Sequence, residues 1–350
     1  MFIGLKAWHL RLLVTLTIWL FQPANPAKCD DEFSPPYRLG SGYALSDSGF
    51  RLGGYVNAEV MAAGTNPWQF QVNDLSLFVS WDKSSWLRFF SELELADVLT
   101  AGQSQALSTH QTHFESERFY FDGLVNDKLT VRVGKFLTPI GQWNVLHAAP
   151  LVWTTYRPVA TDNLFSTHVS GLMLHGALPF ADRQLEYAVY GDVTETVDPH
   201  LSDNPFKDAF GAHLRYQWND QLQFGISFTN FLLINTQSDR YSLVGIDGLW
   251  QYKKYEIRSE IVYRSHGNLP NDKSLWQGYL QGVAPLNRHW FLVGRYEAFQ
   301  QTVDNTGHVG VMGLAYRPSP PIVWKLEYRI GANNDRLAPD GLAASFAVLF

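Results

Sequence analysis

Charged residues recur at every second position in several segments of the chain, a spacing that could serve acid–base chemistry or line a polar wall. The segments are Glu256, Arg258 and Glu260; Arg295 and Glu297; Lys325, Glu327 and Arg329; and Arg88, Glu92 and Glu94. A carboxylate pair such as Glu92 and Glu94 could act as general acid and base. Because comparable charges recur on many segments, we expect these side chains to line a polar wall instead.

Catalytic and cofactor-binding signatures are missing from the sequence. It contains no G-x-S-x-G, H-E-x-x-H, G-x-G-x-x-G or P-loop motif, and its 11 histidines show no ligand-like spacing on one face. We therefore expect no catalytic residues, no metal site, no cofactor and no enzymatic activity. A lipase or protease embedded in a barrel remains an alternative, as does a plugged structural or adhesin barrel.

The positions between these charges are apolar. In residues 255–265 they carry Tyr255, Ile257, Ile261 and Tyr263. This period of two indicates strands with one apolar and one charged face. The composition agrees, because Phe 23, Tyr 16 and Trp 12 far exceed Met 4, and aromatic residues favour strands.

Such segments recur along residues 50–350, and the links between them alternate between short and mostly longer ones. Outer-membrane barrels have short periplasmic turns and long extracellular loops, so we predict an all-β, transmembrane antiparallel β-barrel of about 16 strands. A soluble β-sandwich with its charged faces outward is the alternative. Aromatic residues at strand ends beside the short links predict a periplasmic girdle, formed by Trp218, Trp250, Tyr255, Trp290 and Trp324.

The N-terminal residues have the order of a secretory signal peptide. Lys6 and Arg11 precede an apolar run at 12–21, and small residues follow it. We expect residues 1–27 to be the signal peptide, 28–49 a periplasmic segment and 50–350 the barrel, located in the cell outer membrane. Acylation of Cys29 is an alternative with unfavourable flanking residues. For this acidic exported chain, of net charge −6, we expect no nucleic-acid partner.

The chain ends on the alternating apolar stretch "GLAASFAVLF". A soluble sheet would blunt such an edge, whereas in a closed barrel the last strand pairs with the first and has no free edge. The terminal Phe350 looks like the signal that outer-membrane proteins present to their assembly machinery. We therefore expect outer-membrane lipid and that machinery as partners.

The longest link, residues 138–167, is rich in apolar side chains, including Val145, Leu151 and Trp153. These would be costly to leave in water, and loops of this length are usually functional, so we expect it to fold into the barrel between strands five and six. Arg157 could then face the pore or pair with Glu260. The residues expected at the constriction and along the lumen are Arg157, His147, Arg132, Arg88, Glu92, Glu94, Arg258, Glu260, Arg295, Glu297, Lys325, Glu327 and Arg329.

The stretch "VGKFLTPIG" at 133–141, together with the long link after it, resembles the phosphate-selective O/P type of Gram-negative porin. The resemblance implies a sixteen-stranded barrel whose third extracellular loop narrows the lumen, passive diffusion of small hydrophilic solutes or ions, and commonly a homotrimer. One departure argues against phosphate as the solute: those porins line their pores with ladders of Arg and Lys, whereas basic residues here are interleaved with acids.

Overall fold

A computed structural model describes residues 37–64, 68–103, 105–146, 148–180, 183–193, 205–234, 240–266, 274–302 and 305–350. The expected signal peptide and Cys29 lie outside the described residues, as do residues 28–36 of the expected periplasmic segment. No helix in the described part of the chain is long and apolar enough to cross a membrane.

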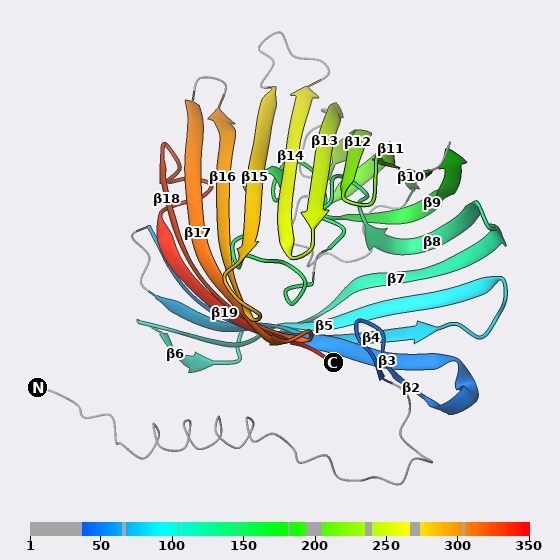
Figure 1. Cartoon of the computed structure of the whole chain (residues 1–350), viewed down its shortest axis with the longest axis horizontal. Coiled ribbons are helices and arrows are strands. Elements are labelled where there is room, and N and C mark those ends of the chain that lie inside the picture. Colours follow the sequence, from blue (N-terminus) through cyan, green and yellow to red (C-terminus); the bar gives the residue numbers. More distant parts are fainter. Residues whose placement is uncertain are drawn as a thin grey trace, which may run out of the picture. The chain divides into compact units, whose positions relative to one another are not determined.

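The described residues form a closed barrel of 16 antiparallel strands (Figure 1). Each strand pairs with its neighbour in chain order. The barrel strands are β3 (Phe50–Ala63), β4 (Gln69–Trp81), β5 (Leu87–Gly102), β7 (His113–Asn126), β8 (Leu129–Leu137), β9 (His168–Phe180), β10 (Arg183–Asp192), β11 (Phe206–Gln217), β12 (Leu222–Leu233), β13 (Arg240–Tyr252), β14 (Tyr255–His266), β15 (Leu275–Pro285), β16 (Trp290–Thr302), β17 (Asn305–Ser319), β18 (Ile322–Ala332) and β19 (Gly341–Leu349).

Three short strands extend this sheet without entering the ring. They are β1 (Tyr37–Arg38), β2 (Gly42–Ala44) and β6 (Gln105–Ser108), and two 3₁₀ turns complete the described elements, η1 (Ser46–Ser48) and η2 (Val159–Thr161). Strand β2 pairs with β3, and β6 pairs with β5.

The ring closes where the last strand meets the first. Strand β19 pairs with β3 from Gly341 opposite Ala63 to Leu349 opposite Tyr55. Beyond it, Gly54 and Phe350 exchange backbone hydrogen bonds of 2.9 and 2.8 Å. The apolar C-terminal strand therefore has no unpaired edge, as the sequence predicted.

The exposed face of the barrel is its apolar face. On β14, Ile257 and Ile261 are 46% and 59% exposed, whereas the alternate residues Glu256, Arg258 and Glu260 are no more than 8% exposed. Four of the five predicted girdle aromatics are more than 40% exposed beside short turns, and Trp250 is half-buried. A sheet closed on itself with its apolar side outward excludes the soluble sandwich and is suited to a lipid environment.

Replacing Phe346 with Asp should prevent insertion of the barrel. Phe346 lies on the outer face of β19, where its ring is 4.3 Å from that of Trp324. The substitution removes this ring contact and places a carboxylate on the lipid-facing surface, where a charge is destabilising. We expect little heat-modifiable protein in outer-membrane fractions, with Ser345→Asp on the inward face as the control. Normal amounts of the folded Phe346→Asp variant would contradict the outward assignment.

Candidate functional site

The connection between β8 and β9, residues 138–167, runs inside the ring of strands and is here called the internal loop (Figure 1). Its two ends are tied together at its base. Thr138 donates its hydroxyl to Ser166 O at 2.6 Å, and Asn144 Nδ2 donates to Thr138 O and Thr167 O at 2.8 and 3.1 Å. A link of this length therefore leaves and re-enters the wall at one place and must fold within the lumen.

The first turn of the internal loop is fixed by a glycine against a buried glutamate. Gly141 has a φ of +63°, and a Cβ at this position would lie 1.8 Å from Glu260 Oε2. Glu260 accepts hydrogen bonds from the Trp143 backbone N–H at 2.8 Å and from the Tyr279 hydroxyl at 2.6 Å. The glycine is required both by its left-handed conformation and by the close approach of the carboxylate.

Two further glutamates hold the distal part of the loop in the same way. Glu327 accepts from the Tyr156 N–H at 2.6 Å, and Glu297 accepts from the Val159 N–H at 2.7 Å. With Glu260, these carboxylates come from β14, β16 and β18, and each is no more than 2% exposed. Hydrogen bonds to a charged acceptor are worth about 1.5–3 kcal/mol each, so the three carboxylates fix the loop backbone against this wall.

Basic residues of the same wall bind the loop's acceptors. Arg295 donates to Thr154 Oγ1 at 2.6 Å and to Tyr156 O at 2.9 Å, and Lys325 donates to Ala149 O at 2.9 Å. The guanidinium of Arg329 lies 3.7 Å from the centre of the Tyr156 ring. Burial raises the pKa of the Tyr156 phenol, which therefore stays protonated.

Apolar contacts complete the attachment of the loop to the wall. Ile140 and Trp143 belong to one buried cluster with Val262 of β14 and Tyr279 of β15. Further along the loop, the Trp153 ring lies 5.0 Å from that of Phe291 on β16. Many apolar residues of this link are thus buried inside the barrel, which accounts for their presence in a loop, whereas Leu151 is 49% exposed and Val145 and Trp153 are half-buried.

Seven of the predicted lumen residues are buried on the inner face, and all of them except Arg258 have a contact with the internal loop described above. Each is no more than 8% exposed, and all lie on β14, β16 or β18: Arg258, Glu260, Arg295, Glu297, Lys325, Glu327 and Arg329. Of these, Lys325 still reaches the edge of a cavity. The alternation of charged and apolar residues predicted that they lie on the inner face, as they do. The loop packs across this face, so the charged side chains bind the loop. Their predicted place at the constriction and along the lumen stays a prediction.

Arg157 is bound mainly by its own loop. Its Nη2 donates to Asn144 Oδ1 at 2.7 Å and to Thr161 O at 2.5 Å, and its guanidinium lies 4.9 Å from the Trp143 ring. The alternative pairing with Glu260 is wrong, because Glu260 is bound by Trp143 and Tyr279. His147 lies outside the described residues.

The opposite half of the wall carries the other four predicted residues. Arg132 pairs with Asp122 at 2.7 and 2.8 Å, Glu92 pairs with Arg118, and Glu94 accepts from Ser76 at 2.6 Å. The side chain of Arg88 is 53% exposed and pairs with Asp82 in a short turn, so it lies at the rim, away from the loop. The predicted positions of Arg132, Glu92 and Glu94 on the inner wall agree with these contacts.

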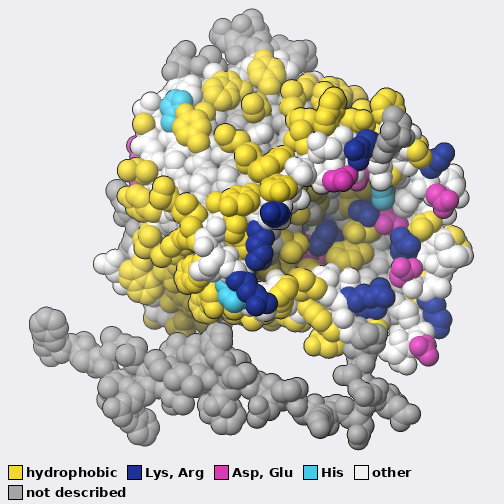
Figure 2. Space-filling model, viewed as in Figure 1, with side chains coloured by type: hydrophobic (Ala, Val, Ile, Leu, Met, Phe, Trp, Pro, Cys, Tyr) yellow, Lys and Arg dark blue, Asp and Glu magenta, His cyan; other side chains and the backbone are white. Residues whose placement is uncertain are grey.

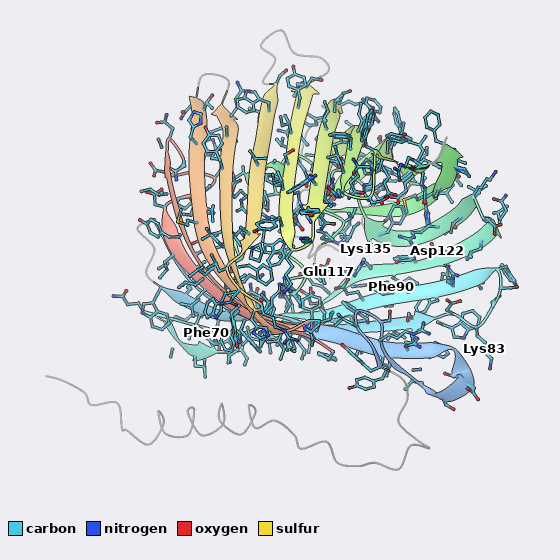
Figure 3. The ribbon with its side chains drawn as sticks, in the orientation of Figure 1. Phe70, Lys83, Phe90, Glu117, Asp122 and Lys135 are labelled. Carbon is cyan, nitrogen blue, oxygen red and sulfur yellow. The ribbon has the colours of Figure 1, made fainter. Side chains whose placement is uncertain are left out.

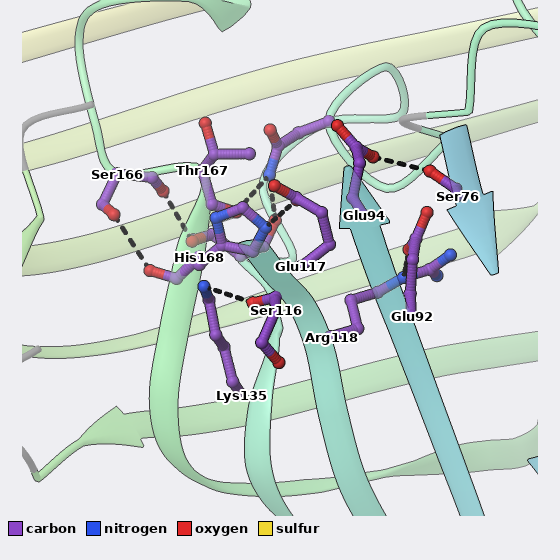
Figure 4. Close-up of polar contacts among 12 residues, drawn as sticks. Ser76, Glu92, Glu94, Ser116, Glu117, Arg118, Lys135, Ser166, Thr167 and His168 are labelled. Carbon is purple, nitrogen blue, oxygen red and sulfur yellow. Dashed lines mark hydrogen bonds and ion pairs between the residues drawn. The ribbon is translucent and has the colours of Figure 1, made fainter. Parts of the chain in front are cut away.

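Sequence reasoning missed several charged side chains on β7 and β8. Figure 3 labels Glu117, Asp122 and Lys135 on these strands; Asp122 shares the inner face with Arg132, whereas Lys135 lies opposite the 46% exposed Phe119, on the other face. Glu117 lies 2.8 Å from His168 Nε2, and Lys135 donates to Ser116 O at 2.6 Å (Figure 4). A register shift opposite Glu92 and Leu93 leaves one residue of β7 unpaired and interrupts the strict alternation. The acidic and basic content of residues 115–122 was the signal that could have indicated them.

A cavity of about 390 Å³ remains between the internal loop and strands β3 and β4. Its lining is Asn57, Glu59, Met61, Asn73 and Asp74 from these strands, and Trp143, Ala149, Val152, Thr154, Thr155, Tyr156, Arg157, Lys325 and Ser345 from the loop and the wall beneath it. In space-filling view, one face of the barrel is hollowed, and both basic and acidic side chains gather in the hollow (Figure 2). In the described part of the chain, no three His, Cys, Asp or Glu side chains are grouped to hold a metal ion.

Thiol labelling should distinguish the open wall from the covered wall. In a Cys29→Ser background, cysteine at Arg132 is expected to react with a small water-soluble thiol reagent in intact outer membranes. Cysteine at Glu260 or Glu297 should stay unreactive because the internal loop covers these positions. Cysteine at the lipid-facing Ile257 serves as the outward control. Rapid labelling at Glu297 would show that the loop leaves this wall open.

Comparison with solved structures identifies the fold. OmpF of Salmonella typhi, in a complex with daunomycin, matches with a TM-score of 0.63 at 10% identity over 88% of this chain and 99% of that one. The anion-selective porin of Comamonas acidovorans matches with a TM-score of 0.58 at 12% identity, over 86% of this chain and 99% of that one. The trimer form of Vibrio cholerae OmpT matches with a TM-score of 0.59 at 10% identity, over the same shares of the two chains. No family model and no curated protein sequence matches. The chain therefore has the closed barrel fold of outer-membrane porins and channels.

Proposed function

We propose that this protein is an outer-membrane porin that lets small hydrophilic solutes diffuse passively across the membrane. One observation carries the proposal. A closed barrel with an apolar exterior contains a polar inner wall, and its internal loop leaves a cavity of about 390 Å³ beside strands β3 and β4. Barrels of sixteen to eighteen strands are about the size at which an aqueous channel remains.

The arrangement of charged side chains supports a channel that is not restricted to anions or to cations. On the open wall, Arg132 pairs with Asp122 and Arg118 pairs with Glu92, so neither cation stands alone. The resemblance of residues 133–141 to the phosphate-selective O/P type supports the porin class. The paired charges differ from a ladder of free basic residues and therefore do not favour phosphate as the solute.

We further propose that the protein has no enzymatic activity. Its proposed partners are membrane lipid, the outer-membrane assembly machinery and two further copies of the chain. The apolar exterior fits membrane lipid, and the apolar C-terminal strand with Phe350 fits recognition by the assembly machinery. A trimer form is recorded for one structural neighbour, the OmpT protein of Vibrio cholerae. We propose a homotrimer for this chain on that ground.

Planar-bilayer recording of the purified, folded protein tests the proposed function. We expect stepwise, ohmic conductance increases in KCl on addition of protein, and swelling of proteoliposomes in small sugars. Membranes that receive heat-unfolded protein provide the control. A folded barrel that gives neither conductance nor swelling would contradict the proposal and favour a plugged barrel. Hydrolysis of lipid or peptide substrates by a non-conducting barrel would favour the enzyme.

A further inference from the structure

A β-bulge in β4 turns two consecutive residues toward the cavity beside the internal loop. In the pairing with β3, Asn57 lies opposite Asp74 and Ala58 lies opposite Val72, so Asn73 has no partner. The pairing with β5 skips the same residue. A bulge places an extra residue and re-aims its side chain. Asn73 and Asp74 therefore both line the cavity, although strict alternation would place only one of them there.

Two amide oxygens of this wall are buried and have no hydrogen-bond partner among the described residues. Asn57 is only 6% exposed and donates its Nδ2 to Asp74, yet its Oδ1 has no hydrogen-bond partner among the described residues. Asn73 donates its Nδ2 to Glu59, and its own buried Oδ1 likewise has no partner in the described part of the chain. A buried acceptor without a donor costs about 1–3 kcal/mol, so this wall is suited to a ligand that brings N–H donors.

The same cavity also has two basic residues in its lining, one from the loop and one from β18. Arg157 and Lys325 line it together with the hydroxyl-bearing Thr154 and Thr155. The cavity thus has two carboxylates, from β3 and β4, and two cations, Lys325 from β18 and Arg157 from the loop, and its formal charge is balanced. An ion of either sign would meet both favourable and repulsive groups.

We propose that this cavity recognises a small zwitterionic solute of the amino-acid class, a proposal that rests on the porin function above. The ammonium group has three N–H donors and no acceptor. In the bound state the Asn57 and Asn73 amides turn their oxygens toward the ammonium group, which also donates to the carboxylate of Glu59, while the solute carboxylate faces Lys325 and Arg157. The volume of about 390 Å³ lies within the range of small-molecule sites, about 300–1,000 Å³.

Current block by two isomeric zwitterions tests the proposal on the unmodified protein. Valine carries an ammonium group with N–H donors, whereas glycine betaine, its isomer, carries a trimethylammonium group with none. We expect valine to reduce the single-channel KCl current saturably, with a half-blocking concentration about tenfold below that of betaine, because betaine leaves the amide oxygens unpaired. Acetate and ethanolamine, which carry one charge each, should block less than valine.

Substitution of the acceptors gives the second arm of the test. Asn57→Leu and Asn73→Leu remove the free oxygens, and each should raise the half-blocking concentration of valine several-fold while leaving that of betaine unchanged. Asn230→Leu on β12 is the matched control, because the Asn230 amide is paired with Ser242 and Arg240 and does not line the cavity. The heat-modifiable band of each variant reports whether the barrel has folded.

The results separate failure of this inference from failure of the proposed function. Equal block by valine and betaine in a conducting channel would overturn the ammonium site and leave the porin function standing. Stronger block by acetate than by valine would assign the cavity to anions, and stronger block by ethanolamine would assign it to cations; either result overturns the zwitterion. A folded barrel without any conductance would overturn both proposals.

Discussion

Removal of residues 145–155 is expected to raise the single-channel conductance about twofold or more, because the internal loop occupies the lumen of a barrel wide enough for an aqueous channel. The deletion removes the segment that covers Lys325 and reaches the Arg295 guanidinium through Thr154. These charges then face water, which adds fixed charge to the pore wall. Bilayer recording in KCl, with reversal potentials in a salt gradient, measures both effects.

The control for this deletion is a variant that lacks residues 105–110, the exposed β6 hairpin that extends β5. We expect that variant to conduct like the parent. Folding of both variants is checked by heat-modifiability before recording. If the loop-deleted barrel folds and conducts like the parent, the internal loop does not limit the pore, and the constriction must lie elsewhere in the chain.

Replacement of Gly141 with Val is expected to detach the first turn of the internal loop. A side chain at Gly141 adopts a left-handed φ, which costs about 1–2 kcal/mol, and its Cβ overlaps the Glu260 carboxylate. Glu260 cannot give way without losing its bonds to Trp143 and Tyr279, each worth about 1.5–3 kcal/mol. We expect a noisier channel of higher mean conductance, and faster cleavage of the loop by added protease.

Gly282→Val is the matched control, because a Cβ at Gly282 meets no atom within 4 Å and its φ is not left-handed. It adds the same side chain to β15, next to β14. We expect normal folding, quiet current and a protease-resistant loop from this variant. A Gly141→Val barrel with the parent's current and protease resistance would show that the contact with Glu260 does not hold the loop.

Most of the barrel could be predicted from the sequence because its determinants are local. A strand alternates its side chains between two faces, so the pattern of residues 255–265 indicates both the strand and its orientation. The 16 predicted barrel strands are confirmed, and so is the closure of the C-terminal strand onto the first. The girdle beside the short turns was also predictable, since strand ends and turn residues are adjacent in sequence.

The bulge at Asn73 could not be predicted in this way. Alternation assigns Asn73 and Asp74 to opposite faces, and the extra residue becomes visible only when the registers of β3 and β5 against β4 are both known. Registers depend on pairing between distant segments. Asn57 and Asn73, whose amide oxygens lie beside the cavity, were therefore not among the site residues predicted from the sequence.

By itself, the sequence determined which side chains face inward on the strands without a bulge, because the face of a regular strand is a property of a few consecutive residues. The tertiary structure decided what those inward residues meet. Glu260 and Trp143 are 117 residues apart, and Glu327 and Tyr156 are 171 apart, yet each pair forms a hydrogen bond. The path of the internal loop depends on such long-range contacts, which leave no period in the sequence. The same alternation of charge thus gives anchors for the loop on β14, β16 and β18, and an ion pair between neighbouring strands at Asp122 of β7 and Arg132 of β8.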